Sequence, residues 1–246
     1  MMAALYAEFR KFLTVRSTYI VSIIGLVLAG FIAFWGIGYK GDAQLLQQSD
    51  ALQHASMDVI SIVGVFVGIL AILLICHEYR YNTISYTLTI SNSRFRVLIA
   101  KLITVGAYAL LMTFVAIALG MGLVALGANM ANHPLGTQSI DFYSLLWKTI
   151  AYMIGSAWLG LFLGFLSRSL VFAIVAYFLI PTLEPILNGL LKISNNYLPT
   201  AAQNQILQTS SAPDVFSPVA SLGVFAIYMA VAFIASTVLF LRRDAN

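Results

Sequence analysis

The chain has 246 residues, of which 61% are hydrophobic and 9% charged, and its mean hydropathy is +0.92. Soluble domains contain about 45–50% apolar and about 25% charged residues, so this composition excludes an ordinary soluble domain and a disordered chain. A membrane-spanning helix needs about 20 residues, and the length therefore predicts about six crossings with short connections. The net charge of +4 is modest, so the positions of the basic residues matter more than their number.

The first predicted element is an amphipathic helix over about residues 2–14. Its polar face contains Glu8, Arg10 and Lys11. Its apolar residues recur at helical spacing: Met2, Leu5, Tyr6, Phe9, Phe12 and Leu13. Such a helix is expected to lie in the plane of the membrane surface. It serves either as a polar lead-in to the first span or as a specific docking element, and amphipathicity does not distinguish these roles.

Six stretches are apolar enough to cross a membrane, and the sequence predicts one all-α transmembrane domain over residues 1–246. The predicted spans are about 17–39, 57–76, 101–128, 147–167, 169–191 and 216–241. Small residues at four-residue spacing predict close helix packing in the second, third and fourth spans. They are Gly64 and Gly68, Ala116 and Gly120, Ala118 and Gly122, and Ser156, Gly160 and Gly164.

The connection from His77 to Lys101 interleaves Tyr, Ile, Leu and Phe with Glu and Arg. It is too polar to span a membrane and too apolar for a solvated loop, so we expect a short helix in it that is buried against a surface. That surface is either a partner protein or the lipid headgroups. In the second case Arg94, Arg96 and Lys101 would contact anionic lipid.

Glu184 falls within the fifth predicted span, between Pro181 and Pro185. Proline lacks the helical N–H, so the carbonyl groups that it frees must face protein or water, and the helix is expected to break here. Glu184 with the two prolines is therefore a candidate for the substrate path, where it would contact a cationic group or gate water. Alternatively, the span ends near Ile180 and Glu184 lies among the headgroups. Beyond the break, residues 198–207 predict a short amphipathic helix.

With six spans, both termini and two further connections lie on one side of the membrane. That side carries ten basic residues: Arg10, Lys11, Arg16, Arg80, Arg94, Arg96, Lys101, Arg168, Arg242 and Arg243. The opposite side carries three, Lys40, Lys148 and Lys192. The positive-inside rule therefore predicts that both termini are cytoplasmic.

The sequence contains no G-x-x-x-x-G-K-[ST] motif for binding a nucleoside triphosphate. His54, His77 and His133 fall in three different connections without a cysteine or carboxylate at metal-ligand spacing. We therefore expect no catalytic residue, metal or cofactor in this chain. Any coupling to ATP would come from a partner.

Several residues resemble the permease subunits of ABC type-2 exporters. In that family a Glu, a Gly-Thr pair, a Leu, a Ser-Arg pair and a Lys follow the second span. Glu78, Thr83, Leu88, Ser93-Arg94 and Lys101 occupy these places here, with Asn82 where glycine is usual. The N-terminal Glu8-x-x-Lys11 followed by Arg16 is similar to the family's membrane-surface helix, and Leu241-Arg242-Arg243-Asp244 is similar to its common ending.

The resemblance implies a coupling helix between spans two and three that seats on an ATPase subunit. The implied ATPase-coupling interface consists of Glu78, Thr83, Leu88, Arg94, Glu8 and Lys11. In this hypothesis Glu78 holds the short helix in place, and Arg94 pairs with Glu78 or with the ATPase. The implied partners are two ABC ATPase subunits, which bind ATP and magnesium, and a second permease subunit that is identical or paralogous. The segment between spans five and six would close the translocation path at the outer side.

The expected function is that of a permease in an ATP-driven exporter of the prokaryotic plasma membrane. It would move a hydrophobic or amphipathic substrate, such as a peptide antibiotic, a lipid or a drug, by alternating access. The alternative is an ATP-independent secondary transporter that uses Glu184 as a proton-linked acid. Inverted repeats would favour this alternative, and the two halves of the chain show no convincing similarity.

Overall fold

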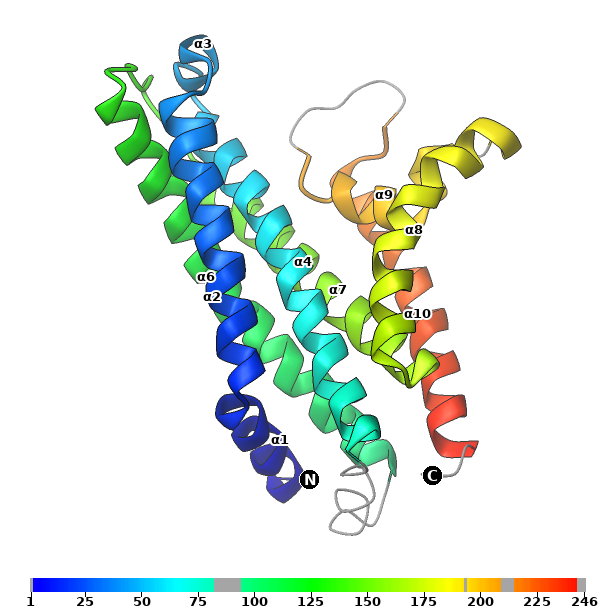
Figure 1. The fold of residues 1–246 in the computed structure, drawn as a ribbon. Coiled ribbons are helices and arrows are strands. Elements are labelled where there is room, and N and C mark those ends of the chain that lie inside the picture. The colour runs from blue at the N-terminus through cyan, green and yellow to red at the C-terminus, as the bar shows by residue number, and fades with distance from the viewer. Residues whose placement is uncertain (1, 82–93, 193, 209–214, 243–246) are drawn as a thin grey trace.

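The computed structural model describes residues 2–81, 94–192, 194–208 and 215–242, which contain helices and no strand (Figure 1). In chain order the elements are α1 (Met2–Thr14), α2 (Arg16–Phe31), the π-helix η1 (Ile32–Tyr39), α3 (Ala43–Leu46), α4 (Ala51–Arg80), α6 (Arg94–Met130), α7 (Phe142–Ser167), α8 (Leu170–Leu191), the 3-10 helix η2 (Asn195–Tyr197), α9 (Pro199–Gln205) and α10 (Pro218–Arg242). Within these ranges six helices, the first formed by α2 with η1, are long and apolar enough to cross a membrane. The predicted all-α, six-span fold is confirmed.

Two spans extend well beyond the apolar stretches read from the sequence. α4 begins at Ala51 rather than near Met57, and it includes Glu78 in its last turn. α6 begins at Arg94, so Lys101 lies about two turns inside this helix. Charged residues mark the edge of the apolar segment but not the end of the helix, because Lys, Arg and Glu are good helix formers.

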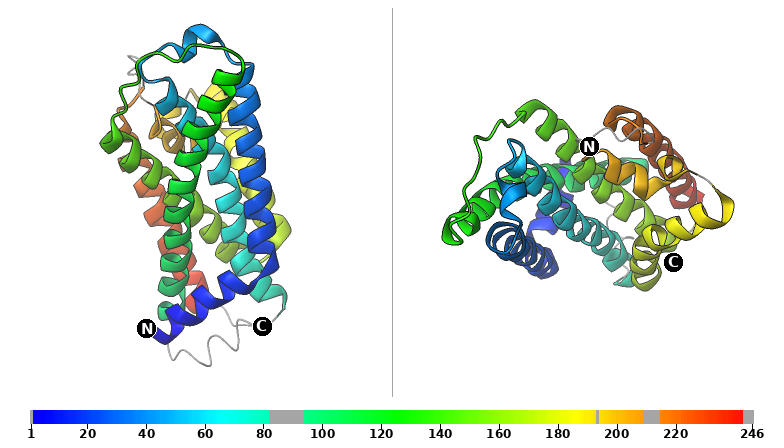
Figure 2. Two further views of the ribbon diagram at one scale, coloured as in Figure 1. Left: turned by 90° about the vertical axis from the view of Figure 1, so that its left-hand side faces the viewer. Right: turned by 90° about the horizontal axis from the view of Figure 1, so that it is seen from above.

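α4 and α7 form the centre of the bundle (Figures 1 and 2). A methyl group added to Gly160 of α7 would collide with the backbone carbonyl of Gly68 in α4, so the two backbones are in direct contact. Gly164 lies on the same seam, against the side chain of Ile75. The predicted close packing is confirmed at these glycines. It is wrong for Gly122, which has nothing within 4 Å of its added methyl position among the described atoms of this chain.

The remaining long helices pack on both sides of this central pair. α2 and α6 lie on one side, and α8 and α10 lie on the other (Figure 1). α2, α8 and α10 turn many large apolar side chains outward, including Val27, Phe172 and Ile227. Outward-facing apolar surface of this extent is expected where helices meet lipid or another subunit.

α1 lies across the end of the bundle that also holds the end of α10 (Figure 2). Phe12 of α1 is buried, and its ring meets that of Tyr108 edge to face at 4.7 Å between centroids. The predicted division of α1 into faces is only partly correct. Glu8 was expected on the polar side but is buried in the protein, whereas Tyr6 and Leu13 are exposed. The reason is that Glu8 has a charged partner on another helix, Lys101 of α6.

α8 runs from Leu170 to Leu191 through both internal prolines. Neither the predicted break nor an end near Ile180 is found; instead, the helix bends in the half that leads away from the termini (Figure 1). The hydroxyl of Thr182, between the prolines, donates to the carbonyl oxygens of Phe178 and Leu179. These carbonyl groups differ from those of Tyr177 and Pro181, which the two prolines leave without a helical N–H partner.

Candidate functional site

Four charged side chains from three helices meet beside α1. The ammonium group of Lys101 in α6 lies 2.7 Å from Glu8 Oε2 of α1 and 2.7 Å from Glu78 Oε1 of α4. The ammonium group of Lys11 in α1 lies 3.0 Å from Glu8 Oε1 and 3.0 Å from Glu78 Oε1. We call these four residues the charge cluster. It brings together three residues that the sequence assigned to the coupling interface, Glu8, Lys11 and Glu78.

The charge cluster is buried and internally neutral. Lys101 is 0% exposed, Glu8 1% and Glu78 6%, whereas the side chain of Lys11 is 36% exposed. Two buried carboxylates thus face two ammonium groups, one of them buried and the other partly exposed. A buried charge is tolerated when it is paired and hydrogen-bonded, and removal of one partner leaves a charge without compensation. The cluster therefore fixes α1 to the ends of α4 and α6.

Lys101 was identified from the sequence only as the lysine that opens the third span and as a possible lipid contact. Its role at the centre of the cluster was missed. A lysine at the edge of an apolar stretch usually extends toward the headgroups, and its position alone does not reveal a partner on another helix.

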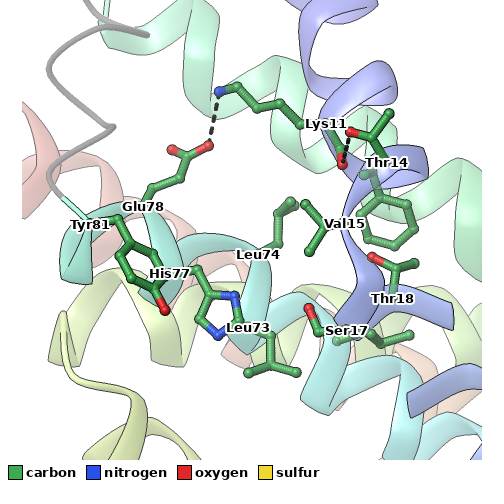
Figure 3. Close-up of a pocket in the computed structure, with 12 residues that line it drawn as sticks. Lys11, Thr14, Val15, Ser17, Thr18, Leu73, Leu74, His77, Glu78 and Tyr81 are labelled. Carbon is green, nitrogen blue, oxygen red and sulfur yellow. Dashed lines mark hydrogen bonds and ion pairs between the residues drawn. The ribbon is translucent and has the colours of Figure 1, made fainter. Parts of the chain in front are cut away.

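A pocket of about 350 Å³ adjoins the charge cluster, between the junction of α1 and α2 on one side and α4 on the other (Figure 3). Lys11 and Glu78 join across it, and His77 and Tyr81 lie on the α4 side. Leu74 contributes to its apolar lining. Of the two carboxylate oxygens of Glu78, Oε2 is buried and has no hydrogen-bond partner among the described residues.

The predicted coupling segment lies between two helices, α4 and α6, that each contribute a residue to the charge cluster. The prediction gave this connection as His77 to Lys101, but α4 continues to Arg80 and α6 begins at Arg94, so both ends of the predicted connection lie within these helices. Thr83 and Leu88 lie outside the described residues, so their assignment to an ATPase interface stays a prediction. The structure nevertheless shows that the two helices that flank residues 82–93 are both tied to α1.

Arg94 makes a contact that the sequence did not predict. Its Nη1 donates to the carbonyl oxygens of Phe240 and Leu241, each at 3.3 Å. These carbonyl groups belong to the last turn of α10, where helical carbonyls lack partners within the helix. Glu78, which was considered as a partner for Arg94, pairs with Lys11 and Lys101 instead. Arg94 therefore joins the start of α6 to the end of α10.

The residues proposed for the substrate path lie apart from the charge cluster, toward the opposite end of the molecule. Glu184 is 5% exposed, and its two carboxylate oxygens accept hydrogen bonds from the backbone amides of Thr200 and Ala201 in α9. Pro181 and Pro185 flank it within the bent α8. Participation of these three residues in a substrate path stays a prediction.

α9 is further bound by polar side chains that the sequence analysis did not single out for this purpose. Gln203 Nε2 donates to Ser156 Oγ at 2.7 Å and to the carbonyl oxygen of Tyr152 at 3.3 Å, both in α7. Gln205 Nε2 donates to Asn196 Oδ1, and the hydroxyl of Ser221 in α10 donates to Gln205 Oε1. The predicted short helix after Leu198 is present and is integrated into the bundle.

A groove of about 780 Å³ lies between α6, α7 and α10. None of its described lining residues is charged, and the aromatic ones are Trp158, Phe162, Phe225 and Phe233. The indole N–H of Trp158 is directed to the carbonyl oxygen of Leu102 at 3.3 Å, so it is occupied within the protein. The groove therefore offers an apolar surface at the depth of the spans.

Comparison with known proteins gives one family. The family model described as "ABC-2 family transporter protein" matches residues 4–184, which is well over half of the chain. The match includes all four residues of the charge cluster and ends at Glu184. No curated protein matches the chain.

Proposed function

The chain belongs to the ABC-2 family of transporter proteins, and from this premise we propose that it is the permease subunit of an ATP-driven exporter. Membership identifies it as a membrane component of a transporter and not as an enzyme by itself. The proposal adds the energy source, the direction of transport and the class of substrate. ATP and magnesium would bind to two separate ATPase subunits, and a second permease subunit, identical or paralogous, would complete the assembly.

The observation that carries the proposal is the contact of Lys101 with both Glu8 and Glu78. Through it, the helices before and after residues 82–93 are bound to each other and to α1. An ATPase that pushed on this segment would therefore act on α1, α4 and α6 together. Arg94 extends the same connection to α10.

The substrate class is inferred from the apolar groove between α6, α7 and α10. Ligand sites are typically concave, mostly apolar and about 300–1,000 Å³ in volume, and this groove has a volume of about 780 Å³. It suits a hydrophobic molecule or the apolar part of an amphipathic one, as in a lipid, a drug or a peptide antibiotic. Movement of α6 relative to α10 would change its width, in keeping with alternating access.

The membrane and the orientation are proposed from the distribution of charge. Ten basic residues on one predicted side against three on the other support cytoplasmic termini, and a prokaryotic plasma membrane is proposed from the resemblance to the exporter permeases. In this orientation the charge cluster and residues 82–93 would face the compartment that contains ATP.

The test is to purify the tagged chain from its native membranes and to identify bound proteins that carry the G-x-x-x-x-G-K-[ST] motif. We expect an ABC ATPase to be recovered, and the reconstituted complex to export a hydrophobic fluorescent dye only while ATP is hydrolysed. Glu78→Gln is expected to preserve ATP hydrolysis but to lower dye export per ATP, with Lys192→Gln as an exposed control that leaves both unchanged.

The same experiment has a defined result that would contradict the exporter proposal. Recovery of no such ATPase, together with dye transport that persists without ATP, would overturn the exporter proposal. Transport that then followed a proton gradient and was lost in Glu184→Gln would support the secondary transporter instead.

A further inference from the structure

The seven-residue helix α9 has an N-terminus that its own preceding residue does not cap. Leu198 occupies the capping position and offers no side-chain acceptor, and Pro199 begins the helix. The first free amides are those of Thr200 and Ala201. They donate to Glu184 Oε1 at 2.6 Å and Glu184 Oε2 at 2.8 Å. The cap is therefore supplied by another helix, α8, and it uses both oxygens of one carboxylate.

Glu184 depends on this contact as much as α9 does. Its side chain is nearly inaccessible, and it forms no ion pair with any cation in the described ranges. A buried carboxylate needs donors, and backbone amides at the positive end of a helix can supply them. With α9 in place the carboxylate is bound by two amides. With α9 removed it would lose both.

Glu184 reaches α9 from the bent part of α8. This residue lies between Pro181 and Pro185, in the part of α8 that bends, and α8 and α9 lie side by side there (Figure 1). The two prolines are thus compatible with an unbroken helix. They flank the turn of α8 that contacts α9.

The remaining contacts of α9 are directed to the neighbouring helices. Gln203 donates to Ser156 Oγ and to the Tyr152 carbonyl oxygen in α7, and Gln205 accepts from Ser221 in α10. Ala202 is fully buried beside them. α9 is therefore a separate short element held in a seat formed by α7, α8 and α10, and Glu184 is the one described carboxylate that binds it.

We propose that Glu184 is a positioning residue that holds α9 in this seat through its two backbone amides. Loss of the carboxylate releases the N-terminal end of α9, which uncovers Ala202 and the polar groups of Ser156 and Tyr152. The effect of this release on transport rests on the proposed function, but the position of α9 does not.

The test measures the accessibility of α9 in the purified full-length protein, in detergent micelles and in lipid nanodiscs. The single native cysteine, Cys76, is replaced by alanine, and Ala202→Cys serves as the probe for a polar maleimide. We expect Glu184→Ala and Glu184→Gln to raise the labelling rate by about tenfold or more, equivalent to about 1.4 kcal/mol in the docking equilibrium. Thr182→Val is the matched control on α8, because the Thr182 hydroxyl bonds only within its own helix among the described residues.

A second pair of probes separates local release from general loosening. Thr200→Cys, also in α9, is expected to follow Ala202→Cys, whereas Ala71→Cys in the buried core of α4 is expected to stay protected. Unchanged labelling of both α9 probes in the Glu184 variants would overturn the proposal. Equal exposure of the Ala71 probe would overturn it as well, because Glu184 would then support the whole fold. These readouts need neither ATP nor a substrate, so they remain decisive if the exporter proposal fails.

Discussion

The ammonium group of Lys101 lies 2.7 Å from a carboxylate oxygen of Glu8, although 93 residues separate the two in the chain. This contact makes α1 a fixed part of the helix bundle rather than an independent segment at the membrane surface. It also places an ion pair where a six-span protein would otherwise have only apolar packing between these two helices.

Replacement of Lys101 by methionine is expected to destabilise the protein strongly. Two carboxylates would share the half-exposed Lys11 as their single described cation, and breaking a buried ion pair from one side costs about 3–5 kcal/mol. The measurement is thermal unfolding of the purified protein in detergent. Lys192→Met, at an exposed position, is the control and should unfold as the unaltered protein does.

The double variant Lys101→Met with Glu8→Gln is expected to lose less stability than the sum of the two single variants. The reason is that each single variant leaves the other residue's charge less well compensated, whereas the double variant removes both. Strict additivity in the same unfolding assay would show that the two side chains do not interact.

Gly160→Ala is expected to destabilise the contact between α4 and α7 by about 1–3 kcal/mol, because the new methyl group meets the backbone carbonyl of Gly68. Gly122→Ala is the matched control, since open space surrounds that position in this chain. Its effect should be neutral or stabilising by up to about 1 kcal/mol. Thermal unfolding distinguishes the two, and equal effects would contradict the packing described for Gly160.

Arg94→Gln is expected to weaken the connection between α6 and α10 with little effect on stability. A cation at a helix C-terminus contributes about 0.3–1 kcal/mol, so folding should survive the change. Under the proposed function, the reconstituted complex should export less dye per ATP hydrolysed. Arg96→Gln, exposed on the same helix, is the control, and an equal loss of coupling in both variants would argue against a specific role for the α10 contact.

The orientation predicts opposite accessibility for the two ends of the bundle. In a Cys76→Ala background, Gln47→Cys should react with a membrane-impermeant maleimide in intact cells. Thr14→Cys should react only after the membrane is permeabilised, because its end of the molecule carries most of the basic residues. Labelling in the reverse order would place the proposed ATPase interface on the wrong side of the membrane.

The number of membrane spans and their helical structure were predictable because apolar runs of sufficient length leave few alternatives in a membrane. The glycines at four-residue spacing in α4 and α7 also indicated where backbones meet. The sequence could not show that Gly122, with the same spacing, faces no described neighbour. Spacing identifies a face of a helix, and the partner of that face depends on how all the helices are arranged.

The charge cluster and the contact of Glu184 with α9 differ in how much of each the sequence could indicate. Glu8, Lys11 and Glu78 were identified, but Lys101, the common partner of the two glutamates, was not, because pairing over such separations follows from tertiary structure. Glu184 was identified because two prolines flank it and because it is an acidic residue within an apolar stretch of the sequence. Its partners were not predictable, because they are backbone amides, which every residue except proline possesses.

The charge cluster also has a consequence for how the chain is made. Glu8 leaves the ribosome early, and its buried counter-ion follows only when α6 is synthesised. Until then Lys11 is the one cation of the cluster that can pair with Glu8 and Glu78. Synthesis of the first two turns of α6 is therefore the earliest point at which all four charges of the cluster can meet.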